Sequence, residues 1–221
     1  MKSIQEIFDN SLFRIPDYQR GYAWKEDQID DFWQDLKNLQ DGKQHFTGTL
    51  TFEVATEEQW ENWPGDQWII GGMNYSPYYV VDGQQRLTTA IILLNVLIDM
   101  MEEDEQMLYQ TKSDLIQKYI YRQNERQNLK SYIFGYEKDN PSYEFLKTKI
   151  FKQTSVSSYA VHETTYTSNL GTADEVFRGH LKGLPLIHRE KVFRKVTQQI
   201  KFDLKVIEND LDIFVVFQTM N

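Results

Sequence analysis

The sequence contains no cysteine, only five prolines and no long apolar run. Without cysteine there is no disulfide, no thiolate nucleophile and no thiolate metal ligand. The longest apolar run, residues 90–98, is about half as long as a membrane-spanning helix must be, and it includes Asn95. The first ten residues lack the apolar core of a signal peptide. We therefore expect a cytoplasmic protein without a membrane span.

Basic residues are scarce in the first half of the chain. Residues 1–110 carry 7 Lys and Arg against 20 Asp and Glu, a net charge of −13, whereas residues 111–221 carry 17 against 13, a net charge of +4. The acidic first half is therefore a poor general surface for nucleic acid. The basic stretch at residues 189–195 is typical of a solvated helix face, and contact with a phosphate backbone is the alternative.

The sequence is 40% hydrophobic and 14% aromatic, which favours a folded protein with a substantial core. Periodicity and capping signals predict helices at residues 3–8, 25–41, 84–101, 141–151, 173–182 and 188–199, one or two more within 106–134, and a last one at 211–221 that could equally be a strand. Alternating and β-branched stretches predict strands at residues 45–55, 67–72, 78–82 and 201–209. Loops are expected at residues 13–24 and 153–172.

These elements predict an α+β fold, in which a small mixed sheet packs against a central helix and is followed by a helical subdomain. The helix at residues 84–101 is apolar nearly all round, so it belongs at the centre of the fold. We divide the chain into a core at 1–105, a helical subdomain at 106–199, and a strand and helix at 200–221 that return to the core. The end at Asn221, directly after an apolar element, we interpret as the boundary of a fragment.

The stretch VVDGQQRLTT, residues 80–89, predicts a site for an anion. A strand that turns through Asp-Gly into a helix leaves the first N–H groups of that helix unpaired, at the positive end of its dipole. Gly83 permits an unusual backbone angle or a close approach, and Arg86 offers a fork of donors suited to phosphate. The other polar side chains have supporting roles: the hydroxyls of Thr88 and Thr89 donate, Asp82 holds Mg²⁺, and Gln84 and Gln85 orient a water or read a base edge.

The structural alternative for this stretch is that Asp82 caps the helix, Arg86 pairs with a carboxylate and Thr88 faces the core. The stretch is not a P-loop, because the GxxxxGK pattern is absent. The two glutamines are neutral amides, which are poor general bases. The residues alone leave the two interpretations about equal.

A second cluster, IPDYQRGYAW at residues 15–24, places Gln19 and Arg20 among aromatic residues that include Tyr22. Such a segment can stack a base and clamp a phosphate. Taken alone, the segment favours another interpretation, in which the aromatic rings fix the arm to the core and Arg20 meets an acidic residue. None of the four histidines has the spacing of a zinc site, and no G-x-S-x-G motif is present.

Four stretches occur in the order IPDYQRGYAW, HFTGTL, VVDGQQRLTT and VFQTMN. Together they resemble the N-terminal domain of GmrSD-type, modification-dependent restriction proteins, over residues 4–221. The resemblance implies a fold like those of ParB and sulfiredoxin and a role in phage defence through cutting of modified DNA. It also implies nucleoside triphosphate binding and Mg²⁺-dependent hydrolysis by the N-terminal domain, with the DGQQR stretch involved, and it leaves the preferred base open.

Carried over position by position, the resemblance implies a nucleotide site made of Gln19, Arg20, Tyr22, Asp82, Gly83, Gln84, Gln85, Arg86, Thr88 and Thr89. The catalytic candidates are Asp82, Gln84, Gln85 and Arg86, and Asp82 is the candidate ligand for Mg²⁺. The implied partners are a nucleotide, DNA through the full-length protein, and a C-terminal HNH-type nuclease domain that this sequence does not contain. We therefore expect no DNA cleavage by this chain. A ParB-like DNA-binding module without NTPase activity and an assembly domain without ligand are the alternatives.

Overall fold

The computed structural model describes residues 1–63, 65–154 and 163–208. Its helices are α1 (Ile4–Ile7), α2 (Glu26–Asn38), α3 (Glu57–Trp60), α4 (Gln67–Met73), α5 (Gln84–Asp99), α6 (Lys112–Tyr119), α7 (Ser142–Phe145), α8 (Thr165–Leu181) and α9 (Leu186–Arg194), with π-helical turns η1 (Leu146–Ile150) and η2 (Lys195–Gln199). Its strands are β1 (Ser11–Ile15), β2 (His45–Val54), β3 (Ser76–Asp82), β4 (Gln106–Met107), β5 (Gln110–Thr111), β6 (Tyr121–Asn124), β7 (Leu129–Tyr132), β8 (Phe134–Tyr136) and β9 (Ile200–Ile207).

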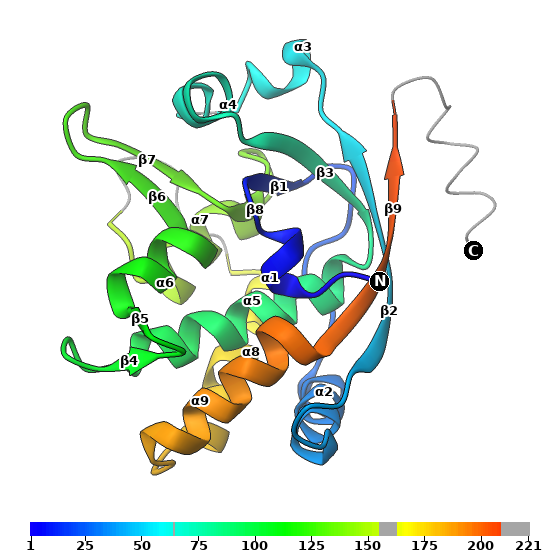
Figure 1. Ribbon diagram of the computed structural model, residues 1–221. Helices are drawn as coiled ribbons and strands as arrows, with labels where there is room; N and C mark the ends of the chain where they lie inside the picture. The colour runs from blue at the N-terminus through cyan, green and yellow to red at the C-terminus, as the bar shows by residue number, and fades with distance from the viewer. Residues whose placement is uncertain (64, 155–162, 209–221) are drawn as a thin grey trace.

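The predicted α+β class is confirmed by a mixed five-stranded sheet in the order β8-β1-β3-β2-β9 (Figure 1). Strands β2 and β3 are antiparallel, whereas the pairs β1–β3, β1–β8 and β2–β9 are parallel. Two small hairpins, β4–β5 and β6–β7, lie outside this sheet. The described residues give no test of a likeness to ParB, which stays a prediction.

Helix α5 is the centre of the fold, as its composition predicts. Every residue from Leu87 to Ile98 is buried, including Asn95. The helix lies beneath the sheet in Figure 1 and packs against α6, α8 and α9. A helix with apolar side chains on all sides is stable only when other elements cover each face, so its position follows from its sequence.

Other predicted elements are confirmed with shifted ends. The helix predicted at residues 3–8 is α1, in which Ser3 and Glu6 form a capping box. Helix α2 ends at Asn38, a turn before the predicted stop, and its buried side chains, Ile29, Phe32, Trp33 and Leu36, have the spacing of one helical face. The expected loop at 13–24 begins only after Ile15, because its first residues belong to β1.

The strand predicted at residues 67–72 is wrong, because this stretch forms helix α4. Its residues Trp68, Ile69 and Ile70 have high strand propensity, but the buried pair Ile69 and Ile70 packs into the core from one helical face. Propensity is a weak guide when tertiary burial favours another element. The polar insertion before it contains the short helix α3, capped by Thr56.

The helices predicted within residues 106–134 are only partly right. Helix α6 covers residues 112–119, but the residues that follow form the hairpin β6–β7 and the sheet strand β8. The loop predicted at 153–172 is wrong from Thr165 onward, where α8 begins with a Thr164 cap. The last predicted element, at residues 211–221, lies outside the described residues.

The range 106–199 thus contributes β8 to the central sheet, beside β1, and the division of the chain into three parts stays a prediction. The strand predicted at residues 201–209 is confirmed as β9. Among the described residues, no helix is both long and apolar enough to cross a membrane.

Candidate functional site

The junction between β3 and α5 places the DGQQR residues around a glycine that no other residue can replace without strain. Gly83 has φ of +81°, in the left-handed region, and it is the N-cap of α5. A Cβ atom at this position would lie 2.4 Å from Cδ2 of Leu50 and 2.9 Å from the carbonyl oxygen of Thr49. The close approach that Gly83 permits is therefore the approach of strand β2, which fixes the start of α5 against the sheet.

Two of the predicted site residues bind the N-terminal arm, residues 16–25, to this junction. Nε2 of Gln19 donates to the carbonyl oxygens of Val80 and Val81, at 2.8 and 2.9 Å. Gln85 of α5 binds the arm in turn: its Oε1 accepts from the N–H of Ala23 at 2.8 Å, and its Nε2 donates to the carbonyl oxygen of Gly21 at 3.2 Å. The two quoted motifs are therefore one folded unit, and these glutamines position it.

Tyr22 and Thr89 also hold the arm in place. The Tyr22 phenol is fully buried and hydrogen-bonds the Thr89 hydroxyl at 2.7 Å, and that hydroxyl donates to the carbonyl oxygen of Gln85 at 2.8 Å. Burial raises the pKa of Tyr22 well above its usual value, so the phenol stays neutral. Both residues lie in the core at this junction, where they act as structural supports.

Arg86 and Gln84 are two partly buried residues of this junction whose side chains keep polar groups without a partner in the described residues. Within the described ranges, the half-buried Arg86 side chain makes no hydrogen bond and no ion pair. Oε1 of Gln84 is buried and has no partner in that same part of the chain. The N-terminal amides of α5 receive no side-chain cap, and the first turn of a helix has no acceptor of its own for them. The free amides and the guanidinium group are both donors that an anion accepts from.

Strand β2 shapes the place where Arg86 lies. Gly48 has φ of +125° and sits at a register shift in the pairing of β2 with β9. A Cβ on Gly48 would lie 3.1 Å from Nη1 and 3.2 Å from Cζ of Arg86. The guanidinium group thus rests against the bare backbone of Gly48, which limits where it can point.

Asp82 and Arg20 are the exposed residues of the predicted site. Asp82 is the last residue of β3. Arg20 lies on the arm between Gln19, whose side chain donates to the carbonyl oxygen of Val81, and Gly21, whose carbonyl oxygen accepts from Gln85. Neither one makes a hydrogen bond or ion pair in the portion of the chain that is described. Asp82 does not cap α5 and Arg86 meets no carboxylate there, so the structural alternative holds only for Thr88, which is buried without a well-formed hydrogen bond.

A metal ion at this junction would depend on Asp82 and on oxygens of a ligand. The described residues contain no group of three or more His, Cys, Asp or Glu side chains that could hold a metal. Mg²⁺ is commonly held by one or two carboxylates together with phosphate oxygens and waters. A single exposed carboxylate next to an anion site fits that pattern only when a phosphate is bound.

Gly48, Tyr166 and Asn169 belong to the surroundings of this site and were not predicted. Asn169 of α8 donates to the carbonyl oxygen of Tyr22 at 3.1 Å, and a Cβ on Gly21 would lie 2.7 Å from Tyr166. A glycine inside the strand pattern HFTGTL signals a bulge or a close approach, so Gly48 had a sequence signal. The two α8 residues had none, because only the tertiary fold brings α8 to the arm.

The comparisons with known proteins agree with this arrangement of motifs. The model of the family described as GmrSD restriction endonuclease, N-terminal domain, matches residues 4–221. No curated protein matches the sequence. Since the match extends over nearly the whole chain, the chain belongs to the GmrSD N-terminal domain family of phage-defence restriction proteins.

Proposed function

We propose that this domain binds a nucleoside triphosphate at the start of α5 and thereby regulates a restriction nuclease. One observation carries the proposal: Arg86, half-buried beside the uncapped amides of a 16-residue helix, has no hydrogen-bond or ion-pair partner among the described residues. A guanidinium group left unpaired in a partly buried position costs free energy, which a phosphate ligand would recover.

Different residues of the chain have different roles in binding the nucleotide. The amides of α5 and Arg86 bind phosphate oxygens, and Arg20 approaches from the arm that Gln19 and Gln85 hold in place. Asp82 would hold a Mg²⁺ ion, which when bound supplies positive charge to phosphate oxygens. Both polar atoms of the Gln85 side chain hydrogen-bond the arm, so Gln84 is the amide available to orient a water. Binding is the proposal, and hydrolysis depends on Asp82 and Gln84.

Thermal unfolding in the presence of GTP, ATP, CTP or UTP with Mg²⁺ tests the proposal. A ligand at about 100 times its Kd stabilises the folded state by about 2.7 kcal/mol, which raises Tm by roughly 5–10 °C for a domain of this size. We expect such a shift with at least one nucleotide. We expect Arg86→Ala to remove the shift and Arg126→Ala, at the exposed turn between β6 and β7, to keep it.

Two outcomes would contradict the proposal. One is the absence of any shift with all four nucleotides, and the other is an unchanged shift in Arg86→Ala. No shift combined with salt-sensitive binding of DNA would support the DNA-binding module instead, since neutralisation of phosphates by Lys and Arg makes binding depend steeply on salt.

A further inference from the structure

A cavity of about 320 Å³ lies at the end of β1 and β8, next to β7, α7 and η1. Neither Arg86 nor any other residue of α5 lines it. Its volume is at the lower end of those of small-molecule sites. Its walls combine lysines, aromatic rings and carboxylates, so the charges of these groups indicate the class of ligand.

Two lysines face this cavity from β7 and η1. Nζ of Lys130 donates to Oε1 of Gln153 at 2.6 Å, and Nζ of Lys147 forms an ion pair with Oε1 of Glu144 at 3.8 Å, a distance too long for a hydrogen bond. Burial lowers the pKa of Lys130, and the positive charge of Lys147 lowers it further. Two ammonium groups that repel each other across one cavity would both be stabilised by an anion between them.

Aromatic rings also line this cavity. Tyr132 and Phe151 are nearly parallel, with ring centroids 5.9 Å apart and an angle of 10°. Nζ of Lys147 lies 5.6 Å from the centroid of Tyr132. Trp63 also lines the cavity, and its ring is covered by Arg14, which is itself neutralised by Asp66. Such walls suit a planar ring that carries a negative group.

The other end of the cavity carries carboxylates at the ends of β1 and β8. Glu137 accepts from the Tyr79 phenol at 2.6 Å and from the N–H of Asp17 at 3.0 Å. Burial and the charges of Glu137 and Asp139 raise the pKa of Asp17 to about 6. Carboxylates only accept hydrogen bonds when ionised, so this end favours a ligand group that donates N–H or O–H.

We propose that this cavity binds a mononucleotide, with the phosphate between Lys130 and Lys147 and the N–H or O–H donors of the base and sugar facing Asp17 and Asp139. A nucleotide combines an anion, a planar ring and donor groups, which are the three features that the walls require. The site is separate from the start of α5 and does not depend on nucleotide binding there.

Isothermal titration of the full chain with 5′-monophosphates of adenosine, guanosine, cytidine and uridine tests this proposal, with the unphosphorylated nucleosides and inorganic phosphate as comparisons. We expect at least one monophosphate to bind, and its nucleoside to bind at least about tenfold more weakly. Lys130→Gln and Lys147→Gln should each weaken the monophosphate at least about tenfold, because each removes a charged hydrogen bond. Titration with a single-stranded trinucleotide shows whether the cavity prefers a free nucleotide or a nucleotide within a strand.

Lys149→Gln is the matched control, since Lys149 is exposed on the same helical turn as Lys147 and does not line the cavity. It and Arg86→Ala should leave the affinity unchanged. The proposal is wrong if no monophosphate binds, if both cavity variants bind as the wild type does, or if Arg86→Ala abolishes the binding. If a lysine variant unfolds, the binding site is located in the wild type from the amide chemical shifts that change when the monophosphate is added. Changes at Gly135 and Lys147 support binding in the cavity, and changes confined to Gly83 and Arg86 exclude it.

Discussion

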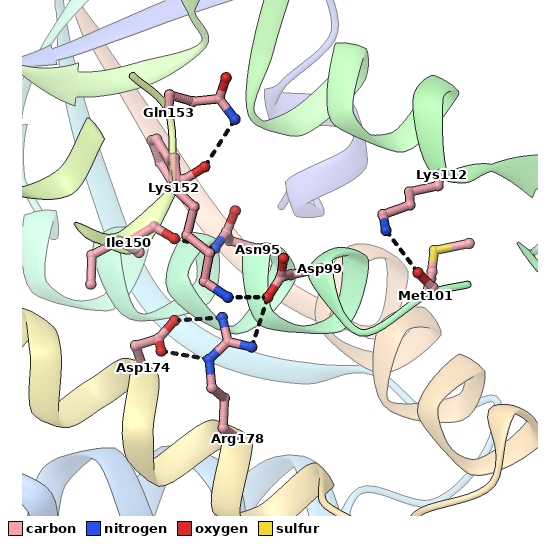
Figure 2. Close-up of polar contacts among 10 residues, drawn as sticks. Asn95, Asp99, Met101, Lys112, Ile150, Lys152, Gln153, Asp174 and Arg178 are labelled. Carbon is pink, nitrogen blue, oxygen red and sulfur yellow. Dashed lines mark hydrogen bonds and ion pairs between the residues drawn. The ribbon is translucent and has the colours of Figure 1, made fainter. Parts of the chain in front are cut away.

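Both ends of helix α5 carry polar side chains, but these side chains have different partners. At its carboxyl end, Asp99 accepts from Lys152 at 2.6 Å and from Arg178 at 2.8 Å, and Arg178 also binds Asp174 of α8 (Figure 2). At its amino end, Arg86 and Oε1 of Gln84 have no such partners in the described part of the protein.

This difference separates groups that stabilise the fold from groups that are free for a ligand. The carboxyl end joins three segments, because Asn95 also donates to the carbonyl oxygen of Ile150 at 2.8 Å (Figure 2). At the amino end the backbone and Gln85 have structural roles, whereas the guanidinium group of Arg86 does not. Stability and binding can therefore be tested by separate substitutions along one helix.

The largest effect is expected at Gly83, where the amino end contributes to stability through its backbone. Gly83→Ala combines a left-handed φ with a contact of 2.4 Å to Leu50, so we expect a loss of about 3 kcal/mol or more in the free energy of unfolding. Gly42→Ala is the matched control, because Gly42 has φ of +78° but no neighbour within 4 Å of a Cβ. Equal losses in urea unfolding of the two variants would exclude a role for the contact with Leu50.

The next effect concerns Asp99 at the carboxyl end. Asp99→Asn should lower the free energy of unfolding by about 1–2 kcal/mol at neutral pH, less than for a fully buried pair because the carboxylate is partly exposed. Burial acts to raise the pKa of Asp99, but hydrogen bonds from Lys152 and Arg178 outweigh it and hold the pKa below its usual value.

The pH dependence of this contribution has a defined sign. A carboxyl group whose pKa is lowered in the folded state stabilises the protein above its unfolded pKa, and this stabilisation is lost as the pH falls through the folded value. Unfolding curves of wild type and Asp99→Asn should therefore converge as the pH falls below about 4. A constant difference between neutral pH and about pH 3 would contradict this account.

The smallest effects separate the two neighbours at the amino end. Gln85→Ala removes the hydrogen bonds to Gly21 and Ala23, so we expect a loss of about 1 kcal/mol in the free energy of unfolding. Arg86→Gln removes no bond within the described chain and should change that free energy by less than about 0.5 kcal/mol. A larger destabilisation by Arg86→Gln than by Gln85→Ala would assign Arg86 to the fold.

The sequence predicted the elements whose burial follows a simple period. The apolar composition of α5 and the spaced apolar face of α2 gave correct helices. The segment 67–73 was predicted wrongly because its local strand propensity disagrees with its tertiary packing. The hairpin β6–β7 was missed because its polar residues carry no clear alternation.

The candidate site was predictable as a set of residues but not in its division of roles. The resemblance to the family brought Gln19, Gln85 and Arg86 into one hypothesis, and the fold does place the arm beside the start of α5. Whether an amide binds a ligand or a neighbouring backbone depends on contacts over about 60 positions of sequence, such as those of Gln85 with Gly21. No local pattern encodes such contacts, so the sequence does not distinguish side chains that support the fold from side chains that are free to bind a ligand.

The parallel pairing of β2 with β9 has a consequence for synthesis on the ribosome. The ladder joins His45 to Ile200 and continues to Glu53 and Ile207. One edge of β2 therefore stays unpaired until a segment some 150 residues later has been translated. At bacterial to eukaryotic elongation rates of about 5–20 residues per second, that edge stays uncovered for roughly 8–30 seconds. An unpaired strand edge of this kind attracts other chains, so the nascent polypeptide is most prone to aggregate, and most in need of a chaperone, during that interval.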